Sequence, residues 1–561
     1  MAVHPDCDFH NTRGPTMRST HRISHSLARL PLISGALILA SIAAPSAAQQ
    51  EGAVAAIIDE GMNRSEIPMR AHDLLDRIGP RLTNSPGMRR AEEWAVREMG
   101  KIGLANVRKE GFEFGRGWEA ISSNVWMVTP RPIELTATPI AWTPGTNGVL
   151  RGEVIVAPME KEEHFAAYRG KLAGKIVMVD LPGTGDEPTT PAFRRLTNEQ
   201  IAERNTFAMP SHDPEAANAR IERQSYALKL DAFLREEGAL ARVEMSYRDG
   251  KLLHGSGYTF MTGQTPSLPA IEIAAEDYRR LARLARTGPA PEITIESNVR
   301  FVDDDPLAYN IIGEIPGTDP RAGYVMAGAH FDSWATGDGA VDNGSGSVAI
   351  LEAARILKTT GARPKRTIRF ALWNGEEQGL LGSLAYVRQH LATRAGENDV
   401  DPATAYYAWD NLWPIQTKPG YADLKAYFNI DNGSGKLRGI HAEGNIAAEP
   451  LLRKWLSPFA SMGAGNVVSG STSGTDHVFL QRIGLPGFQF IQDPLDYSAR
   501  LHHTNIDTYD HLRPDDLRQM ATVLAGVLLQ SANDEETLPR EPLPTQPTVT
   551  DPFKYKLPGQ D

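Results

Sequence analysis

The chain has 561 residues, enough for two to four domains of about 150 residues each. Its composition, 41% hydrophobic and 23% charged, is typical of globular proteins and excludes collagen, coiled coil and general disorder. The net charge of −11 argues against nucleic acid as a partner, because binding to phosphate backbones needs clustered cations. The single cysteine, Cys7, excludes an intramolecular disulfide and a thiolate metal site elsewhere in the chain.

Residues 1–48 have the pattern of a secretory signal peptide. A stretch with Arg18, Arg22 and Arg29 precedes an apolar run of 13 residues, 30–42, and the small residues of APSAAQQ follow. Because a membrane span needs about 20 apolar residues, we predict a signal that is cleaved after Ala48 and no membrane anchor. Translation is predicted to begin at Met17, which would leave Cys7 out. The mature protein is expected to be exported, to the periplasm or the extracellular space.

The next two regions differ in pattern. Residues 49–128 contain two amphipathic helical patterns, the second ended by Gly103, and are predicted to form the N-terminal part of the main domain. Residues 129–300 contain short strand-like runs (VLRGEVIVAP, GKIVMVDLP, SLPAIEIA), which predict an inserted β-rich module. A charged stretch, residues 194–236, interrupts this module and is either an insertion or lid or a solvated helix.

Residues 301–535 alternate apolar runs with helical patterns. The runs are YVMAGA, TIRFALW, AYFNI and GFQFI, and the helical pattern SVAILEAARILKTTG lies between the first two. This alternation predicts an α/β domain in which helices flank a mostly parallel, mixed sheet. Residues 536–561, which include PREPLPTQPTVTDP, show no periodicity and are predicted to form an extended surface tail.

Histidine and acidic residues follow the carboxyl ends of these four runs, where open α/β sheets place their ligands. The candidates are His330 and Asp332 after the first run, Asp342 on the Gly-rich loop GDGAVDNGSGS, Glu376 and Glu377 after the second run, Asp431 after the third, and His502, His503 and Asp507 after the fourth. Each alone has an ordinary explanation, such as a helix cap, an Asx turn or a solvated loop. Their joint position at one sheet edge favours a functional site.

This set of residues predicts a metal centre. Imidazoles with carboxylates, and no cysteine, favour zinc over calcium. Because a catalytic zinc takes three protein ligands, five ligands with one shared carboxylate predict two zinc ions per chain. Asp332 is expected to accept the ring N–H of His330. One of Glu376 and Glu377 is expected to bind metal and the other to act as general base, and spacing leaves open which.

Six strings together resemble a known enzyme family. HFDSW, GAVDNGSG, PKRTIRFALWNGEEQGLLGS, NIDNG, GTDH and HHTNIDT are similar to the zinc-dependent exopeptidases that include bacterial leucyl aminopeptidases, carboxypeptidase Q and glutamate carboxypeptidase II. The resemblance covers residues 309–535 and is strongest to the carboxypeptidase Q branch. It implies a di-zinc exopeptidase fold. In the inserted module, GKLAGKIVMVDLPG and LPAIEIAAEDYRRL resemble the protease-associated domain.

The resemblance also implies a role for each site residue. The implied ligands are His330 and Asp431 on one zinc ion, Glu377 and His503 on the other, and Asp342 as the bridge. Glu376 is then the general base. Asp332, which is expected to orient the His330 ring, is counted with it as a catalytic residue. His503 is preferred to His502 because it matches the family pattern H-[ST]-x-x-D-T. Asn343 departs from the family, which often has a second Asp there, and is expected to make similar turn hydrogen bonds.

The predicted function is that of a secreted zinc metallo-exopeptidase, an aminopeptidase, dipeptidase or carboxypeptidase Q-like enzyme that acts on short peptides. One alternative is a glutaminyl cyclase-like enzyme with one catalytic zinc ion. Another is a non-catalytic receptor on the same fold, which would be expected to have lost ligands. Arg500 is either a contact for a substrate carboxylate or, as we favour, a surface residue. The terminus that is recognised and a homodimeric state are left open.

Overall fold

The computed structural model describes residues 47–186, 188–207, 214–264, 266–401 and 404–547. The chain divides into Met1–Pro45 and Ser46–Asp561, and the fold described below is that of the second unit. The predicted signal peptide lies outside the described residues except for its last two, which begin helix α1. Among the described residues, no helix combines the length and the apolar character needed to cross a bilayer.

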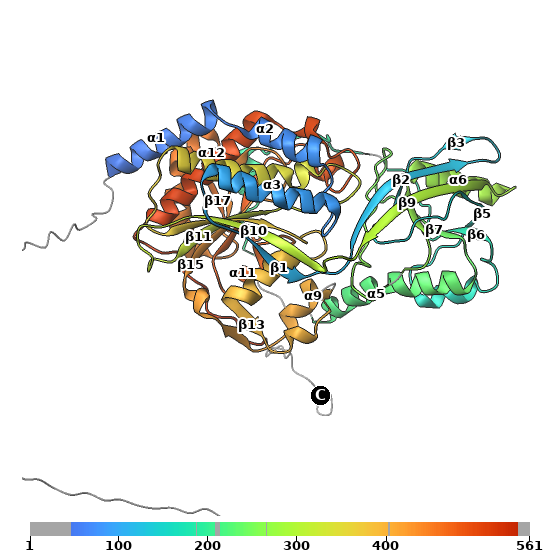
Figure 1. Cartoon of the computed structure of the whole chain (residues 1–561). Helices are drawn as coiled ribbons and strands as arrows, with labels where there is room; N and C mark the ends of the chain where they lie inside the picture. The colour runs from blue at the N-terminus through green and yellow to red at the C-terminus, as the bar shows by residue number, and fades with distance from the viewer. Residues whose placement is uncertain (1–46, 187, 208–213, 265, 402–403, 548–561) are drawn as a thin grey trace, which may run out of the picture. The chain divides into compact units, whose positions relative to one another are not determined.

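The structure contains two eight-stranded sheets, and the one whose strands contain more residues in total is called the larger sheet. The larger sheet forms the predicted α/β domain (Figure 1). In sheet order its strands are β1 (Ala105–Glu113), β10 (Leu307–Ile315), β12 (Thr367–Trp373), β11 (Tyr324–His330), β15 (Leu424–Asn429), β18 (Gly487–Gln492), β16 (Leu437–His441) and β17 (Asn466–Val468). The four central strands, β12 to β18, are parallel, and antiparallel pairs adjoin them on both sides. This arrangement confirms the predicted mixed sheet with a mostly parallel centre.

Helices cover both faces of this sheet. The helices packed in the core of one face are α1 (Ala47–Asn63), α2 (Ile67–His72), α3 (Pro86–Ile102), α7 (Ser345–Thr359), α10 (Glu449–Leu456) and α12 (Pro514–Asn533). The helices of the other face are α8 (Leu381–Tyr386), α9 (Ala405–Ala408) and α11 (Val478–Gln481), near the small hairpin of β13 (Ala392–Arg394) and β14 (Ile415–Thr417). These layers bury the apolar runs and leave the strand ends for polar residues.

Local signals set both ends of α3, and the C-terminal end at Gly103 is the predicted one. Ser85 caps its first turn, because the Ser85 hydroxyl accepts a hydrogen bond from the Met88 N–H at 3.1 Å. Gly103 ends the helix in the left-handed conformation, at φ 82°, which glycine adopts without a steric penalty. The segment that joins α2 to α3 runs past the carboxyl end of β11 and reaches the site described below.

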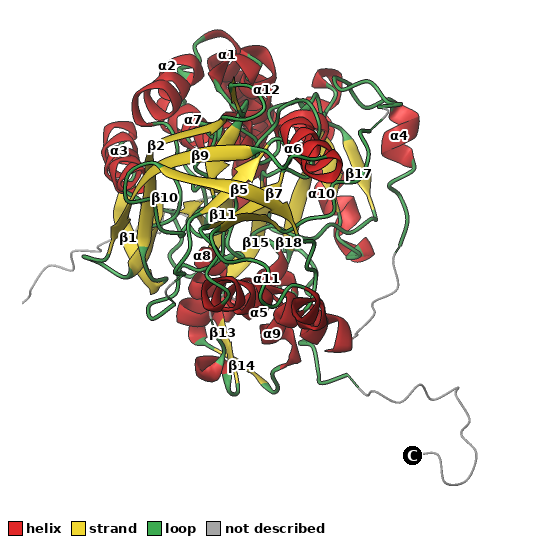
Figure 2. Cartoon of the chain, turned by 90° about the vertical axis from the view of Figure 1, so that its right-hand side faces the viewer, coloured by secondary structure: helices red, strands yellow, loops and turns green. Residues whose placement is uncertain are grey.

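The smaller sheet is the β-rich module. Its strands, in sheet order, are β3 (Ile133–Glu134), β2 (Gly117–Met127), β9 (Glu292–Val302), β5 (Leu150–Val156), β6 (Lys175–Met178), β7 (Ala241–Met245), β8 (Ala270–Ile273) and β4 (Ala137–Pro139). Helices α6 (Ala275–Thr287) and α5 (Pro214–Glu236) lie on opposite sides of it (Figure 2). Its assignment as a protease-associated domain stays a prediction.

The predicted boundary of this module at residue 129 is too late. Strand β2 pairs with β9 along its length, from Gly117 opposite Val302 to Met127 opposite Ile293. The exposed residues in the middle of β2 weaken the apolar alternation by which a strand is identified, so the sequence pattern did not reveal it. The sheet of the module therefore spans residues 117–302.

The charged stretch of residues 194–236 connects the two sheets. Its C-terminal part is α5, which packs Leu230, Phe233 and Leu234 against the smaller sheet and is therefore not a fully solvated helix. Its N-terminal part includes the short helix α4 (Asn198–Ala202), where Ile201 packs into a small apolar cluster with residues of the larger sheet. We call residues 193–207 the strap.

The C-terminal segment has no helix or strand after α12 up to residue 547, as predicted. It is not a free surface tail over its described length, however. Leu538 is buried in the main core, and the Arg540 guanidinium donates hydrogen bonds to the carbonyls of Tyr421, Ala422 and Leu424. The predicted tail beyond residue 547 lies outside the described residues.

Candidate metal centre

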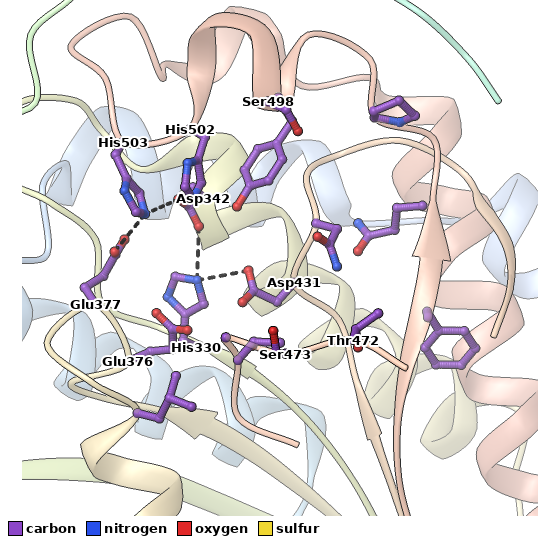
Figure 3. A pocket seen from close by; sticks show the side chains of 18 of the residues that line it. His330, Asp342, Glu376, Glu377, Asp431, Thr472, Ser473, Ser498, His502 and His503 are labelled. Atoms are coloured by element: carbon purple, nitrogen blue, oxygen red, sulfur yellow. Dashed lines mark hydrogen bonds and ion pairs between the residues drawn. The ribbon is translucent and has the colours of Figure 1, made fainter. Parts of the chain in front are cut away.

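A pocket of about 730 Å³ lies at the carboxyl ends of the parallel strands, where the sequence predicts the site (Figure 3). The structure brings all seven predicted residues together there. Six of them line the pocket, and these are His330, Asp342, Glu376, Glu377, Asp431 and His503. Asp332 is fully buried and does not line the pocket.

His330 ends strand β11 and faces two carboxylates. Its Nε2 lies 3.1 Å from Asp342 Oδ1 and 3.2 Å from Asp431 Oδ1. Asp431 follows β15, which pairs directly with β11 in the sheet. His330, Asp342 and Asp431 are all buried, and their ligand atoms lie within 4.8 Å of one another. These atoms form the first potential cation site.

Asp342 also faces a second group of residues through its other oxygen. Asp342 Oδ2 lies 3.2 Å from His503 Nε2 and 3.7 Å from His502 Nε2. His503 Nε2 in turn lies 3.0 Å from Glu377 Oε2. His503 Nε2 is therefore closer than His502 Nε2 to Asp342 Oδ2, and the choice of His503 as the ligand stays a prediction. The two oxygens of Asp342 thus point to two neighbouring sets of potential ligands.

The loop that carries Asp342 is held by hydrogen bonds from remote segments. The Asp507 carboxylate accepts hydrogen bonds from the backbone N–H groups of Val341, at 2.7 Å, and of Asp342, at 3.0 Å. Asp507 was a candidate without an assigned role, and the structure makes it a support for the Asp342 loop. This support fixes a short segment that has little regular structure of its own.

Asn343 makes the turn hydrogen bonds expected of it. Its side-chain oxygen accepts from the Gly346 N–H at 3.0 Å, and its amide donates to the Ile430 carbonyl at 2.8 Å. The first bond satisfies a backbone donor in the first turn of α7. The second joins the Asp342 loop to the residue before Asp431. The departure from the family pattern at this position therefore leaves the loop well supported.

Asp332 does not act on His330 as predicted. The His330 Nδ1–H faces the backbone carbonyl of Asp332 at 3.0 Å, whereas the nearest carboxylate oxygen is 3.8 Å away. The reason is that β11 ends at His330, so the alternation of a strand does not continue to Asp332. The Asp332 carboxylate instead accepts from the N–H groups of Glu376 and Glu377, each at 3.2 Å, and from the Thr83 hydroxyl at 3.0 Å.

The adjacent residues Glu376 and Glu377 have different surroundings. Glu377 faces His503, as described above, while the Glu376 side chain makes no hydrogen bond within the described part of the chain. Burial and the neighbouring Asp431 and Asp476 carboxylates raise the pKa of Glu376 well above its usual value. Burial raises the pKa of Glu377 to about 7. Glu376 is thus a buried carboxyl group that faces the pocket without a protein partner.

The imidazoles bind protons tightly in the metal-free site. Although burial opposes it, the carboxylates of Asp431 and Glu376 raise the pKa of His330 well above its usual value. In the same way, Glu377 and Asp342 raise the pKa of His503 to about 10 against the effect of burial. At neutral pH both rings therefore carry protons that a metal ion has to displace.

We therefore expect metal affinity to fall on acidification. Below the pKa of about 7 for Glu377, this carboxyl group binds a proton in addition to those on His330 and His503. Since metal ligands must be deprotonated, the apparent zinc affinity should drop at least about tenfold from pH 8 to pH 6, with proton release on binding. Calorimetry in buffers of different ionisation enthalpy measures both quantities. Affinity that does not change with pH would contradict the assigned ligands.

Arg81 is a supporting residue that the sequence analysis missed. Its guanidinium is fully buried and donates to the carbonyls of Phe331, at 2.8 Å, Asp338, at 2.7 Å, and Gly339, at 2.8 Å. It therefore joins the segment after His330 to the loop that carries Asp342. Burial lowers the pKa of Arg81 to about 10. No local pattern around residue 81 indicates this role, which depends on contacts about 250 residues away in the chain.

The β-rich module also contributes to the pocket. The His254 ring stacks on His503 at 4.8 Å, and the Thr336 hydroxyl donates to the His254 carbonyl at 2.8 Å. Arg248 and Tyr258 of the module line the pocket. Arg500, by contrast, does not line it, because its guanidinium is bound to Asp496 at 2.9 and 3.0 Å. This agrees with the interpretation of Arg500 as a surface residue.

Comparisons with known proteins place the chain among peptidases. Residues 310–528 match the model of peptidase family M28. Carboxypeptidase Q from Mus musculus is 25% identical over 471 residues, which cover 83% of this chain and 86% of that protein. A peptidase M28 precursor from Shewanella amazonensis has a solved structure with a TM-score of 0.63 at 23% identity, covering 88% of this chain and 99% of that one.

A second solved structure has the same fold. BSAP, a zinc aminopeptidase from Bacillus subtilis, matches with a TM-score of 0.53 at 18% identity, covering 84% of this chain and 95% of that one. The family match includes every predicted ligand, from His330 to His503. The predicted resemblance is thereby confirmed. The chain is a metallopeptidase, and its residues 310–528 match the model of peptidase family M28.

Proposed function

We propose that this protein is a di-zinc exopeptidase that hydrolyses terminal peptide bonds of short peptides. The observation that carries the proposal is the position of Asp342, whose Oδ1 faces His330 and whose Oδ2 faces His503. A carboxylate shared in this way is typical of two-metal hydrolases. The name of the relative carboxypeptidase Q supports cleavage at a chain end.

The residues fit two cations. Glu377 Oε1 is buried and has no hydrogen-bond partner among the described residues, so it has a lone pair for an ion. Asp342 Oδ2 is buried as well and contacts only the two imidazoles of His502 and His503 among the described residues. One ion would be held by His330, Asp431 and Asp342, and the other by Asp342, Glu377 and His503. A mixture of imidazole and carboxylate ligands favours zinc.

The chain's own groups supply the proton transfers. When bound, the two zinc ions would polarise the scissile carbonyl and lower the pKa of the attacking water. Glu376 lines the pocket, and its carboxylate makes no hydrogen bond within the described residues. It can therefore take a proton from the water and return it to the leaving amine. Asp332 holds the backbone of Glu376 and Glu377 and thereby orients both side chains.

Replacing Asp332 with Asn tests this supporting role. The amide group offers only one acceptor, so one of the two backbone N–H groups or the Thr83 hydroxyl loses its partner. We expect kcat/KM for dipeptides to fall about 10- to 100-fold, the range found for supporting residues of metal sites. Thr83→Val, which removes one donor only, is the matched control and should cost less. A D332N enzyme with wild-type kinetics would contradict the role.

The function itself is tested by measuring whether the zinc-loaded protein cleaves free, amino-blocked and carboxyl-blocked dipeptides. We expect free dipeptides to be cleaved, with activity lost on chelation and restored by zinc. Cyclisation of N-terminal glutamine by a one-zinc protein would favour the glutaminyl cyclase alternative. A metal-loaded protein that cleaves none of these peptides would overturn the proposal and favour a receptor. The proposed location is outside the cytoplasm, on the strength of the predicted signal peptide.

A further inference from the structure

Three arginine side chains line the pocket in addition to the candidate ligands. Arg194 and Arg204 belong to the strap, and Arg248 follows strand β7 of the module. Arg204 and Arg248 are half-buried, and Arg194 is exposed. Within the described part of the chain, none of the three forms an ion pair with a carboxylate.

Two carboxylates that contact the strap are paired with other arginines. Arg195 binds Asp493 at 3.0 Å and Asp516 at 2.8 Å, and Arg438 binds Asp493 at 2.9 Å. These contacts fix the strap to the peptidase domain. The Asp493 and Asp516 carboxylates are thus paired with Arg195 and Arg438, and neither pairs with Arg194 or Arg204. Burial and the like charge of Arg194 lower the pKa of Arg204. The strap therefore presents the charges of Arg194 and Arg204 to the pocket, and neither is ion-paired within the described residues.

Arg248 has an unsatisfied donor of its own. Its Nη1 is buried and has no hydrogen-bond partner among the described residues, while its guanidinium lies 4.9 Å from the centre of the Tyr247 ring. Buried donors without a partner are rare in folded proteins, and a ligand is one source of the missing acceptor. Since Arg248 lines the pocket, a molecule bound there can supply that acceptor.

We propose that Arg194, Arg204 and Arg248 form a subsite that binds a carboxylate of the peptide substrate and sets the specificity of the enzyme. The guanidinium group matches a carboxylate in shape and charge, through paired N–H donors. The carboxylate can be the C-terminal group or an acidic side chain, which are chemically alike. This inference rests on the proposed peptidase function and adds to it the class of substrate. It also gives the strap and the module a role in recognition.

The test compares three matched substrates with the zinc-loaded full chain. They are a neutral dipeptide with a free carboxylate, its C-terminal amide, and a dipeptide amide with an acidic side chain. The variants are Arg204→Met, Arg248→Met and their combination, with Arg204→Lys as the conservative change. Arg286→Met, which removes an exposed arginine of α6, is the matched control because it lies outside the pocket.

We expect wild-type kcat/KM to be at least about tenfold higher for a carboxylate-bearing substrate than for the neutral amide. The double variant should reduce this ratio to near one while it still cleaves the neutral amide, and R204K should retain part of it. The preferred substrate shows whether the C-terminus or a side chain is bound. Two results would overturn the proposed subsite and leave the peptidase proposal standing. One is a wild-type kcat/KM that is the same for the carboxylate-bearing substrate and the neutral amide. The other is a double variant that prefers the carboxylate as strongly as R286M does. Failure to cleave any substrate would overturn the peptidase proposal as well.

Discussion

Replacing Glu376 with Gln is expected to reduce kcat for dipeptides by about 10²- to 10⁴-fold, the contribution typical of a general base. Gln has nearly the same shape but cannot accept the proton of the attacking water. The Glu376 side chain makes no hydrogen bond within the described residues, so its replacement should disturb neither the fold nor the zinc content. Steady-state kinetics and metal analysis of the same preparation measure both effects.

The neighbouring residue supplies the control. Glu377→Gln removes the same charge one position along the chain, from a side chain that lies 3.0 Å from His503. This variant should lose zinc affinity, whereas E376Q should keep it. Peptidase activity within about tenfold of wild type in zinc-replete E376Q would show that Glu376 is not the base.

Replacing Asp342 with Asn is the second change with a large expected effect. The variant loses the negative charge that both groups of ligands share, because each oxygen of Asp342 faces a different histidine. At two equivalents of zinc per chain we expect the variant to bind fewer than two zinc ions, and to lose activity by about 10³-fold or more, comparable to the loss of a general base. Zinc titration followed by activity and metal content checks this.

Asp338 is the matched control for this substitution. It lies on the same glycine-rich loop and is half-buried, but it does not line the pocket. Asp338→Asn removes an equal charge and should leave zinc binding near that of wild type. If D342N still bound two zinc ions with wild-type affinity, Asp342 could not be the bridge.

The proposed ligands could be brought together from the sequence alone because their signals are local. His330, Glu377 and Asp431 each follow an apolar run that forms a parallel strand, and parallel strands bring their carboxyl ends to one edge. The choice of Glu377 over Glu376 as a ligand needed the resemblance to a family. The contact with His503 then provided a structural reason for it.

The supporting contacts could not be predicted in this way. Asp332 was assigned to the His330 ring on the assumption that strand geometry continues, but the chain leaves the strand at His330. Arg81 and Arg248 reach the site from segments that are distant in sequence and carry no periodic signal. Strand β2 was not assigned to the module, because its exposed middle weakens the apolar alternation typical of a strand. Such features depend on tertiary packing, which no short window of sequence contains.

The most direct measurement is anomalous diffraction at the zinc edge from crystals of the zinc-loaded full chain. The account predicts two zinc peaks, one beside His330 and Asp431 and the other beside Glu377 and His503, with Asp342 contacting both. A single zinc peak in fully loaded, active protein, or two peaks that do not share Asp342, would contradict the account.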